Sequence, residues 1–339
     1  MERIKKWVFP FIDISRPPLD FMGVCLATCG VVIALNAMGN SLPIVQCILG
    51  AIAVFITTGG MHTINDYFDR LRDHELWPDR PIPSGKLRPL HALAFALGLF
   101  TAGLTLILVL FNPVCFTVVL VTITLGVVYS RYLRDRVGYL SLAPIIGLFP
   151  VGGYAAFAGN EVFFSLAPWM LFFMVTLWQA GHILVYSPAH GVTMKERETK
   201  TVVPAFLVAL SPRATAFLGA IFFGALLILS LCLYLVVPLS LAYLLVVVAS
   251  GGAMIILSLK LAANPIREIS IMTFQAASLY AIILFSAIAL DIFFRFLFLS
   301  DFFSIFIGFF ALLLIGFFAY TIIRGLIGSL KNLRTLRKK

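Results

Sequence analysis

The sequence predicts an all-α, polytopic membrane protein, a bundle of about nine to ten transmembrane helices. Of its 339 residues, 61% are hydrophobic, and the mean hydropathy is +1.04. Only 12% are charged, whereas soluble proteins carry about 25%. The apolar residues form long unbroken runs, each near the roughly 20 residues that a helix needs to cross a bilayer. The solid apolar runs argue against a transmembrane barrel, whose strands are short and alternate in polarity.

Ten apolar segments are long enough to span a membrane as helices. We expect them at Leu19–Met38, Leu42–Ile64, His91–Leu110, Pro113–Tyr129, Leu140–Gly159, Phe163–Tyr186, Ala214–Val237, Leu239–Leu259, Ile271–Phe294 and Phe302–Ile323.

The basic residues predict how these spans are oriented. The formal net charge is +10, which in a soluble protein would indicate a nucleic-acid partner. Here the basic residues flank apolar segments. If successive loops alternate sides, every Lys and Arg except Arg295 lies on the side of the N-terminus. Because basic loops stay in the cytoplasm, we predict a multi-pass protein of the cell membrane with both termini cytoplasmic and no nucleic-acid partner.

The chain divides into three predicted parts. Residues 1–18 are basic and partly apolar, as expected of a segment that lies in the membrane interface. Residues 19–294 form the main transmembrane domain, and residues 295–339 add a further span and a basic cytoplasmic tail. The five cysteines all lie in apolar segments, so we expect buried thiols and neither a disulfide framework nor a zinc site.

An acidic stripe follows the second predicted span. If the helix continues beyond the membrane, Asp66, Asp69 and Asp73 share one face, with Asn65 beside them. Carboxylates this close repel one another unless a cation binds, and hard oxygen ligands suit Mg²⁺ together with substrate phosphates. The spacing therefore predicts a site for Mg²⁺ and a diphosphate. The alternative is a solvated acidic helix end, balanced by the arginines between the aspartates.

The next segment, Trp77–Leu87, cannot be helical, because it contains three prolines and a glycine. We expect a rigid turn that returns Arg80 and Lys86 toward the acidic stripe. Basic side chains beside a metal-bound diphosphate would stabilise it as a leaving group.

These motifs resemble those of the UbiA prenyltransferase superfamily. The resemblance rests on Asn-Asp-x-x-Asp-x-x-x-Asp from Asn65, on the following Pro-Asp-Arg-Pro-Ile-Pro-Ser-Gly, and on Ser15-Arg16-Pro17 before the first span. It implies a helical membrane enzyme that uses Mg²⁺ to transfer an isoprenyl chain from a polyprenyl diphosphate to an aromatic or other lipophilic acceptor. The partners are then the donor, the acceptor and membrane lipid. The sequence leaves the acceptor, the chain length and the oligomeric state open.

The resemblance also implies residue roles. The catalytic, metal-binding residues would be Asp66, Asp69 and Asp73, with Asn65 as a helper. Polar groups would surround the diphosphate. They are Arg80, Lys86, Tyr129 and Arg134.

One family motif is missing. The family carries a second Asp-x-x-x-Asp motif where this chain has Ser187–Arg197, which contains no aspartate. Three explanations stay open. Glu196 or Glu198 replaces the second metal-binding motif; Lys195 and Arg197 supply the positive charge of a second metal; or the site is inactive or has another use.

Two histidines lie at the inner ends of apolar spans. His182 is either an acceptor contact or general base, or a neutral imidazole bonded between helices, and the same choice holds for His62. We expect a prenyltransferase whose donor ionises at the cytoplasmic face. The alternatives are a terpene cyclase of the same superfamily and a catalytically silent protein that binds polyprenyl diphosphates.

Overall fold

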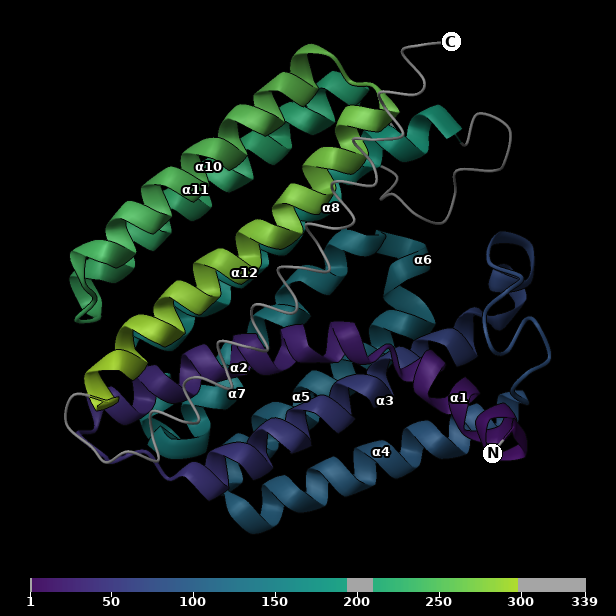
Figure 1. The fold of residues 1–339 in the computed structure, drawn as a ribbon, viewed down its shortest axis with the longest axis horizontal. Coiled ribbons are helices and arrows are strands. Elements are labelled where there is room, and N and C mark those ends of the chain that lie inside the picture. Colours follow the sequence, from purple (N-terminus) through teal and green to yellow (C-terminus); the bar gives the residue numbers. More distant parts are fainter. Residues whose placement is uncertain (1, 194–209, 298–339) are drawn as a thin grey trace. The chain divides into compact units, whose positions relative to one another are not determined.

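A computed structural model describes residues 2–193 and 210–297, and within them it contains helices and turns and no strand (Figure 1). In this part of the chain, nine helical segments are long and apolar enough to cross a membrane. The predicted all-α transmembrane fold is therefore confirmed. The tenth predicted span, Phe302–Ile323, lies outside the described residues.

The elements follow one another along the chain as helices joined by short turns. The α-helices are α1 Glu2–Ser15, α2 Pro17–Ala37, α3 Ile44–Leu76, α4 Pro89–Leu110, α5 Pro113–Val128, α6 Arg134–Val137, α7 Ala143–Ala158, α8 Leu166–Thr193, α10 Pro212–Val236, α11 Leu241–Ala263 and α12 Arg267–Leu297. A π-helix, η1, covers Tyr129–Leu133, and two 3₁₀ helices, η2 and η3, cover Tyr139–Leu142 and Gly159–Phe163.

Two helices extend well past their predicted apolar segments. α3 ends at Leu76 rather than near Ile64, and α8 ends at Thr193 rather than near Tyr186. For α3 the reason is physical: hydropathy reports where the membrane ends, and a helix can continue beyond that point because no proline or glycine interrupts residues 61–76. The extension of α3 carries the acidic stripe.

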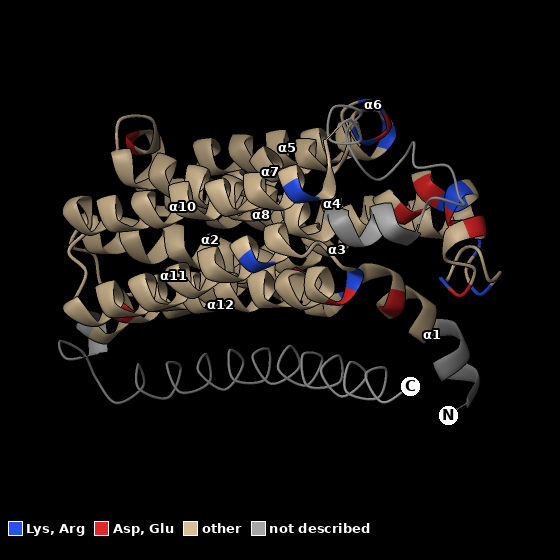
Figure 2. Ribbon diagram, turned by 90° about the horizontal axis from the view of Figure 1, so that it is seen from above, with Lys and Arg blue, Asp and Glu red and all other residues tan. Residues whose placement is uncertain are grey.

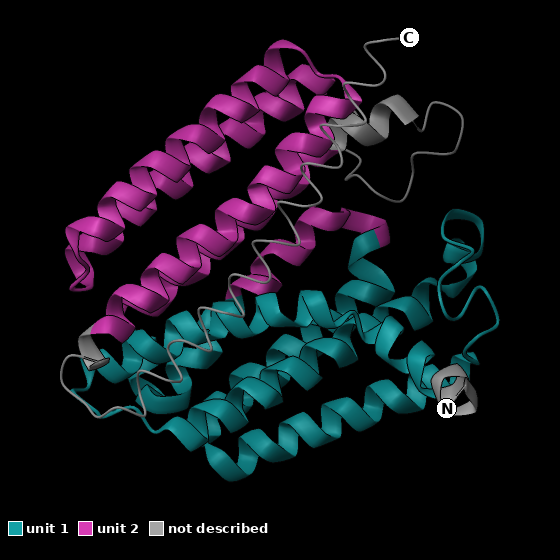
Figure 3. Cartoon of the chain, viewed as in Figure 1, with its two compact units in different colours: residues 1–134, 148–164 teal, residues 135–147, 165–339 magenta. Residues whose placement is uncertain are grey.

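The chain forms two compact units, shown in Figure 3. Unit 1 comprises residues 1–134 and 148–164, and α3 is its central helix, packed against α1, α2, α4 and α5. α2 and α7 approach backbone to backbone. A Cβ at Gly30 would overlap the backbone of Pro150, and one at Gly153 would overlap that of Ala27. Such glycine contacts are a common way to pack helices within a membrane.

Unit 2 comprises residues 135–147 and 165–339, of which the described helices are η2, the start of α7, α8 and α10–α12. α8 packs against α10 and α12. The indole nitrogen of Trp178 on α8 donates to the carbonyl of Ala277 on α12 at 2.9 Å. Ser270 Oγ donates to the carbonyl of Val185 at 2.6 Å. Hydrogen bonds of this kind hold helices together where no water competes for them.

Candidate active site

The acidic stripe lies on a buried face at the C-terminal end of α3. Asp66, Asp69 and Asp73 have exposed fractions of only 3%, 5% and 3%. Their spacing places them on one helix face, as the sequence predicts. Figure 2 shows the charged residues at this end of unit 1, the end where α1 also lies. Buried charges of one sign need partners, and arginines provide them.

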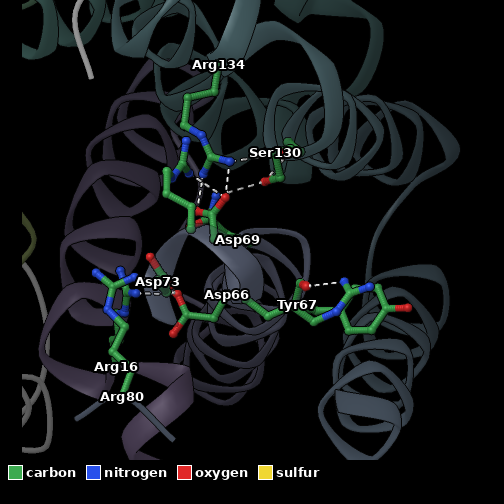
Figure 4. A network of polar contacts seen from close by, with 12 residues as sticks. Arg16, Asp66, Tyr67, Asp69, Asp73, Arg80, Ser130 and Arg134 are labelled. Atoms are coloured by element: carbon green, nitrogen blue, oxygen red, sulfur yellow. Dashed lines mark hydrogen bonds and ion pairs between the residues drawn. The ribbon is translucent and has the colours of Figure 1, made fainter. Parts of the chain in front are cut away.

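Two arginines hold the outer carboxylates (Figure 4). Arg16, between α1 and α2, donates to Asp66 Oδ1. Arg80 Nη1, from the turn after α3, donates to Asp73 Oδ2 at 2.6 Å and to Asp66 Oδ1 at 3.5 Å. The predicted return of Arg80 toward the stripe is therefore observed. Its guanidinium also lies over the ring of Trp77, 5.3 Å from the centroid.

The central carboxylate has the most buried arginine. Both terminal nitrogens of Arg134, a residue only 4% exposed, donate to the two oxygens of Asp69. Arg72 donates to the same carboxylate. The Asn65 amide can donate to Asp69 Oδ2 at 3.2 Å while its oxygen accepts from Arg134 Nη1 at 2.9 Å. Asn65 thus bridges the carboxylate of Asp69 and the guanidinium of Arg134.

A π-helix places Arg134 beside Asp69. α5 widens at Tyr129–Leu133, and Arg134 follows directly. Such π-turns are rare and often occur at functional sites. Within η1, Ser130 Oγ donates to the carbonyl of Gly126 at 2.9 Å and lies 3.3 Å from the side-chain amide of Asn65, whose oxygen faces it in this orientation. Tyr129 is buried at the start of the turn.

The backbone of Arg16 is strained. Its φ and ψ are 56° and 58°, the left-handed region, and among the described non-glycine residues no other has a positive φ. Such a conformation costs on the order of 1–3 kcal/mol and is often found at functional sites. The guanidinium bond to Asp66 offsets part of this cost.

The strain predicts a difference between two substitutions at this position. Arg16→Ala and Arg16→Gly both remove the guanidinium, but only glycine adopts a positive φ without strain. We expect the glycine variant to be more stable by about 1 kcal/mol, measured as the difference in thermal unfolding midpoints of the purified proteins. Equal midpoints would show that the strain is negligible.

The cluster as a whole carries one excess positive charge, because three aspartates face four arginines. Among the described residues, no group of three or more acidic, His or Cys side chains is close enough together to hold a metal ion. Each carboxylate faces a guanidinium instead. The donor chemistry still fits a magnesium diphosphate, since carboxylates suit the ion and guanidinium groups suit the phosphates.

The other predicted site residues lie elsewhere. Lys86 is exposed, and its Nζ is 3.5 Å from the carbonyl of Asp79. His182 belongs to unit 2, where it stacks between Trp178 and Phe274 with ring centroids 5.5 and 3.9 Å away. The remaining four lie outside the described residues. They are Lys195, Glu196, Arg197 and Glu198.

Three contributors were not predicted as site residues. Arg16 and Arg72 complete the arginine set, and Ser130 lies beside Asn65. The position of Arg16 directly before the first apolar segment was a usable signal, because an arginine there reaches the same end of the bundle as the acidic stripe.

The fold and the site define a class of protein: a multi-pass helical membrane protein with a buried carboxylate–guanidinium cluster suited to a metal-bound anion. The sequence model of the UbiA prenyltransferase family matches residues 24–270, well over half of the chain. The chain belongs to this family.

Curated relatives share parts of the sequence. The digeranylgeranylglyceryl phosphate synthase of Methanosphaera stadtmanae is 36% identical over 147 residues, 42% of this chain and 52% of that protein. The match thus spans about half the length of that relative. Protoheme IX farnesyltransferase 1 of Cenarchaeum symbiosum is 28% identical over 251 residues, 72% of this chain and 81% of that protein.

Solved structures share the fold. A structure of a digeranylgeranylglyceryl phosphate synthase matches with a TM-score of 0.67 at 19% identity, covering 86% of this chain and 99% of that one. A UbiA homologue from Archaeoglobus fulgidus, bound to GPP and Mg²⁺, matches with a TM-score of 0.54 at 15% identity over 82% of this chain and 99% of its own. At such identities the likeness establishes the fold.

Proposed function

We propose that this protein is an intramembrane prenyltransferase. It transfers an isoprenyl chain from a polyprenyl diphosphate to an aromatic or other lipophilic acceptor. The observation that carries the proposal is the buried cluster in which the three aspartates of α3 form ion pairs with four arginines. The names of the relatives, which include prenyl- and farnesyltransferases, support the same reaction class.

Each part of the cluster has a role in this reaction. Asp66, Asp69 and Asp73 would hold Mg²⁺, and bound Mg²⁺ would offset the charge that develops on the diphosphate as it leaves. Arg80 and Arg134 would turn from the carboxylates to the phosphate oxygens. Guanidinium groups are suited to this exchange, because they bind phosphate and carboxylate with the same two-pronged geometry.

The remaining predicted residues complete the proposal. Asn65 would orient the metal-binding carboxylates, and Tyr129 would border the diphosphate. Lys86, in the turn after α3, would reach the diphosphate only after a change of side-chain conformation. The site would lie at the cytoplasmic face of the domain formed by residues 19–294, with Arg16 added from the segment before it and residues 187–197 as the altered second motif.

Two alternatives use the same cluster. A terpene cyclase would ionise the same donor but form its product without an acceptor. A silent binding protein would hold the donor without cleaving it. The second alternative is favoured by one specific observation, the absence of any aspartate from Ser187–Arg197.

The test is diphosphate release by the purified full-length protein in detergent. The protein is incubated with donors of increasing chain length and Mg²⁺, with and without a membrane lipid extract. We expect release that stops on addition of EDTA and resumes with excess Mg²⁺. Lipid-dependent prenylated products would identify transfer, whereas acceptor-free cyclic products would identify cyclisation. Donor binding without release, at any chain length, would contradict the enzyme proposal.

A further inference from the structure

A second ionisable pair lies next to the cluster in unit 1. Asp20, in the first turn of α2, is 1% exposed, and its Oδ1 is 3.6 Å from Nε2 of His62 on α3. Neither oxygen of Asp20 accepts a hydrogen bond from any described residue. A buried carboxylate without such partners is costly. Its place near a helix N-terminus offsets part of this cost, but does not explain why an acid occurs here.

The packing makes room for this carboxylate. A Cβ at Gly59 of α3 would come within 3.2 Å of Asp20 Oδ2. A glycine at this position lets the carboxylate lie directly against α3. The imidazole beside it is only partly covered, with 25% of the His62 side chain open. The pair therefore combines a buried acid with a partly exposed imidazole.

The Asp20–His62 pair is offset from the Arg16–Asp66 pair by four residues on both segments. Asp20 follows Arg16 by four residues, and His62 precedes Asp66 by four, so the pair and the Arg16–Asp66 bond form two successive links between the segment at the start of α2 and α3. Four residues of helix rise about 6 Å. The pair thus lies one turn from the diphosphate-binding residues, toward the apolar part of α3.

The other histidine considered as a base differs in this respect. His182 is 9% exposed and is covered on both faces by aromatic rings. It has no carboxylate partner among the described residues. A base must reach the proton that it removes, and His62, with 25% of its side chain exposed, meets this requirement better.

We propose that His62 is the general base that deprotonates a hydroxyl-bearing acceptor, with Asp20 as its positioning residue. The inference rests on the proposed prenyl transfer and deepens it, because it assigns the acceptor to the alcohols and phenols. Nε2 of His62 faces the carboxylate, so the proton belongs on that nitrogen and Nδ1 keeps the basic lone pair. A small approach of the two side chains from 3.6 Å would form a hydrogen bond from Nε2 to Asp20. That bond would fix this tautomer and stabilise the imidazolium, as the acid of a catalytic triad does.

The step balances in atoms and charge. The bond between C1 of the prenyl chain and the diphosphate oxygen breaks, and its electron pair leaves with the diphosphate. A lone pair of the acceptor oxygen forms the new bond to C1. The hydroxyl proton passes to Nδ1 of His62, which then carries the positive charge next to Asp20. No oxidant or reductant is needed.

The experiment compares two rates in the same purified full-length protein. One is diphosphate release without acceptor, and the other is transfer to 1-O-alkylglycerol, 1-O-alkylglycerol phosphate or an alkylphenol, each with Mg²⁺ and a donor that the unaltered protein cleaves. For His62→Gln we expect the ratio of transfer to release to fall by about 100-fold, the typical contribution of a general base. Asp20→Asn should lower it less. His91→Gln, which alters an exposed histidine on α4, is the matched control and should leave both rates unchanged.

Two readouts separate a base from a merely structural residue. Added imidazole should restore transfer in His62→Ala, because it supplies the missing base. An alkyl nitrophenol should be prenylated by His62→Gln with a much smaller loss, because its acidic hydroxyl ionises without help.

Four outcomes would overturn the inference. They are equal losses of transfer and release in His62→Gln, unchanged transfer in that variant, no rescue by imidazole, and release by the unaltered protein without transfer to any hydroxyl acceptor. Failure of the unaltered protein to release diphosphate would instead overturn the proposed function on which the inference rests.

Discussion

Replacement of Arg134 by methionine is expected to destabilise the protein by about 3–5 kcal/mol, the usual effect of stranding one member of a buried ion pair. Arg134 binds both oxygens of Asp69, and both residues are about 5% exposed or less. Without the guanidinium, the remaining cationic partner of Asp69 among the described residues is Arg72, whose side chain is more exposed, at 19%. Water screens that interaction and weakens it.

A double-mutant comparison tests this interpretation. Thermal unfolding midpoints are measured at one scan rate in one detergent for Arg134→Met, Asp69→Leu and the double variant. Because an apolar pair replaces a buried ion pair at little cost, the double variant should be more stable than either single one. Arg72→Met is the control and should shift the midpoint only slightly. If Arg134→Met and Arg72→Met have equal effects, the buried pair does not dominate the stability of this site.

Asp73→Asn is expected to lower Mg²⁺-dependent diphosphate release by roughly 100- to 1,000-fold, as is typical when one electrostatic contact to the leaving group is lost. The substitution preserves shape, and the amide oxygen can still accept from Arg80, whose Nη1 lies 2.6 Å from Asp73 Oδ2. The fold should therefore survive, so the loss would report chemistry.

The matched control for this prediction is Asp79→Asn. Asp79 is an exposed carboxylate in the same turn that carries Arg80, and it has no place in the proposed site. Release rates are compared at saturating donor over a Mg²⁺ titration. We expect Asp79→Asn to behave like the unaltered protein. Equal rates for Asp73→Asn and the unaltered protein would remove Asp73 from the metal site.

The sequence predicts those features that depend on local pattern. Apolar runs placed the nine described spans, and the i, i+3, i+7 spacing placed Asp66, Asp69 and Asp73 on one face. The proline-rich turn that returns Arg80 was also predictable, because proline and glycine restrict the backbone directly.

Features that depend on pairing between distant segments were not predictable. No residue near Asp20 in the sequence indicates that His62 lies beside it. The left-handed backbone conformation at Arg16 was also unpredictable, because glycine is the usual sequence signal for a positive φ and this position holds arginine. The π-helix at Tyr129–Leu133 was equally unpredictable, because the same residues are compatible with an ordinary α-helix. These arrangements follow from how α2, α3 and α5 pack.

The mutual pairing of aspartates and arginines has a consequence for the order in which ligands bind. A lone Mg²⁺ would draw carboxylates away from their arginines and leave buried guanidinium groups uncompensated. A lone diphosphate would do the reverse to the aspartates. Together, the two ligands exchange partners with the cluster, and every charge stays compensated. Each ligand should therefore raise the affinity for the other by the same factor, as thermodynamic linkage requires.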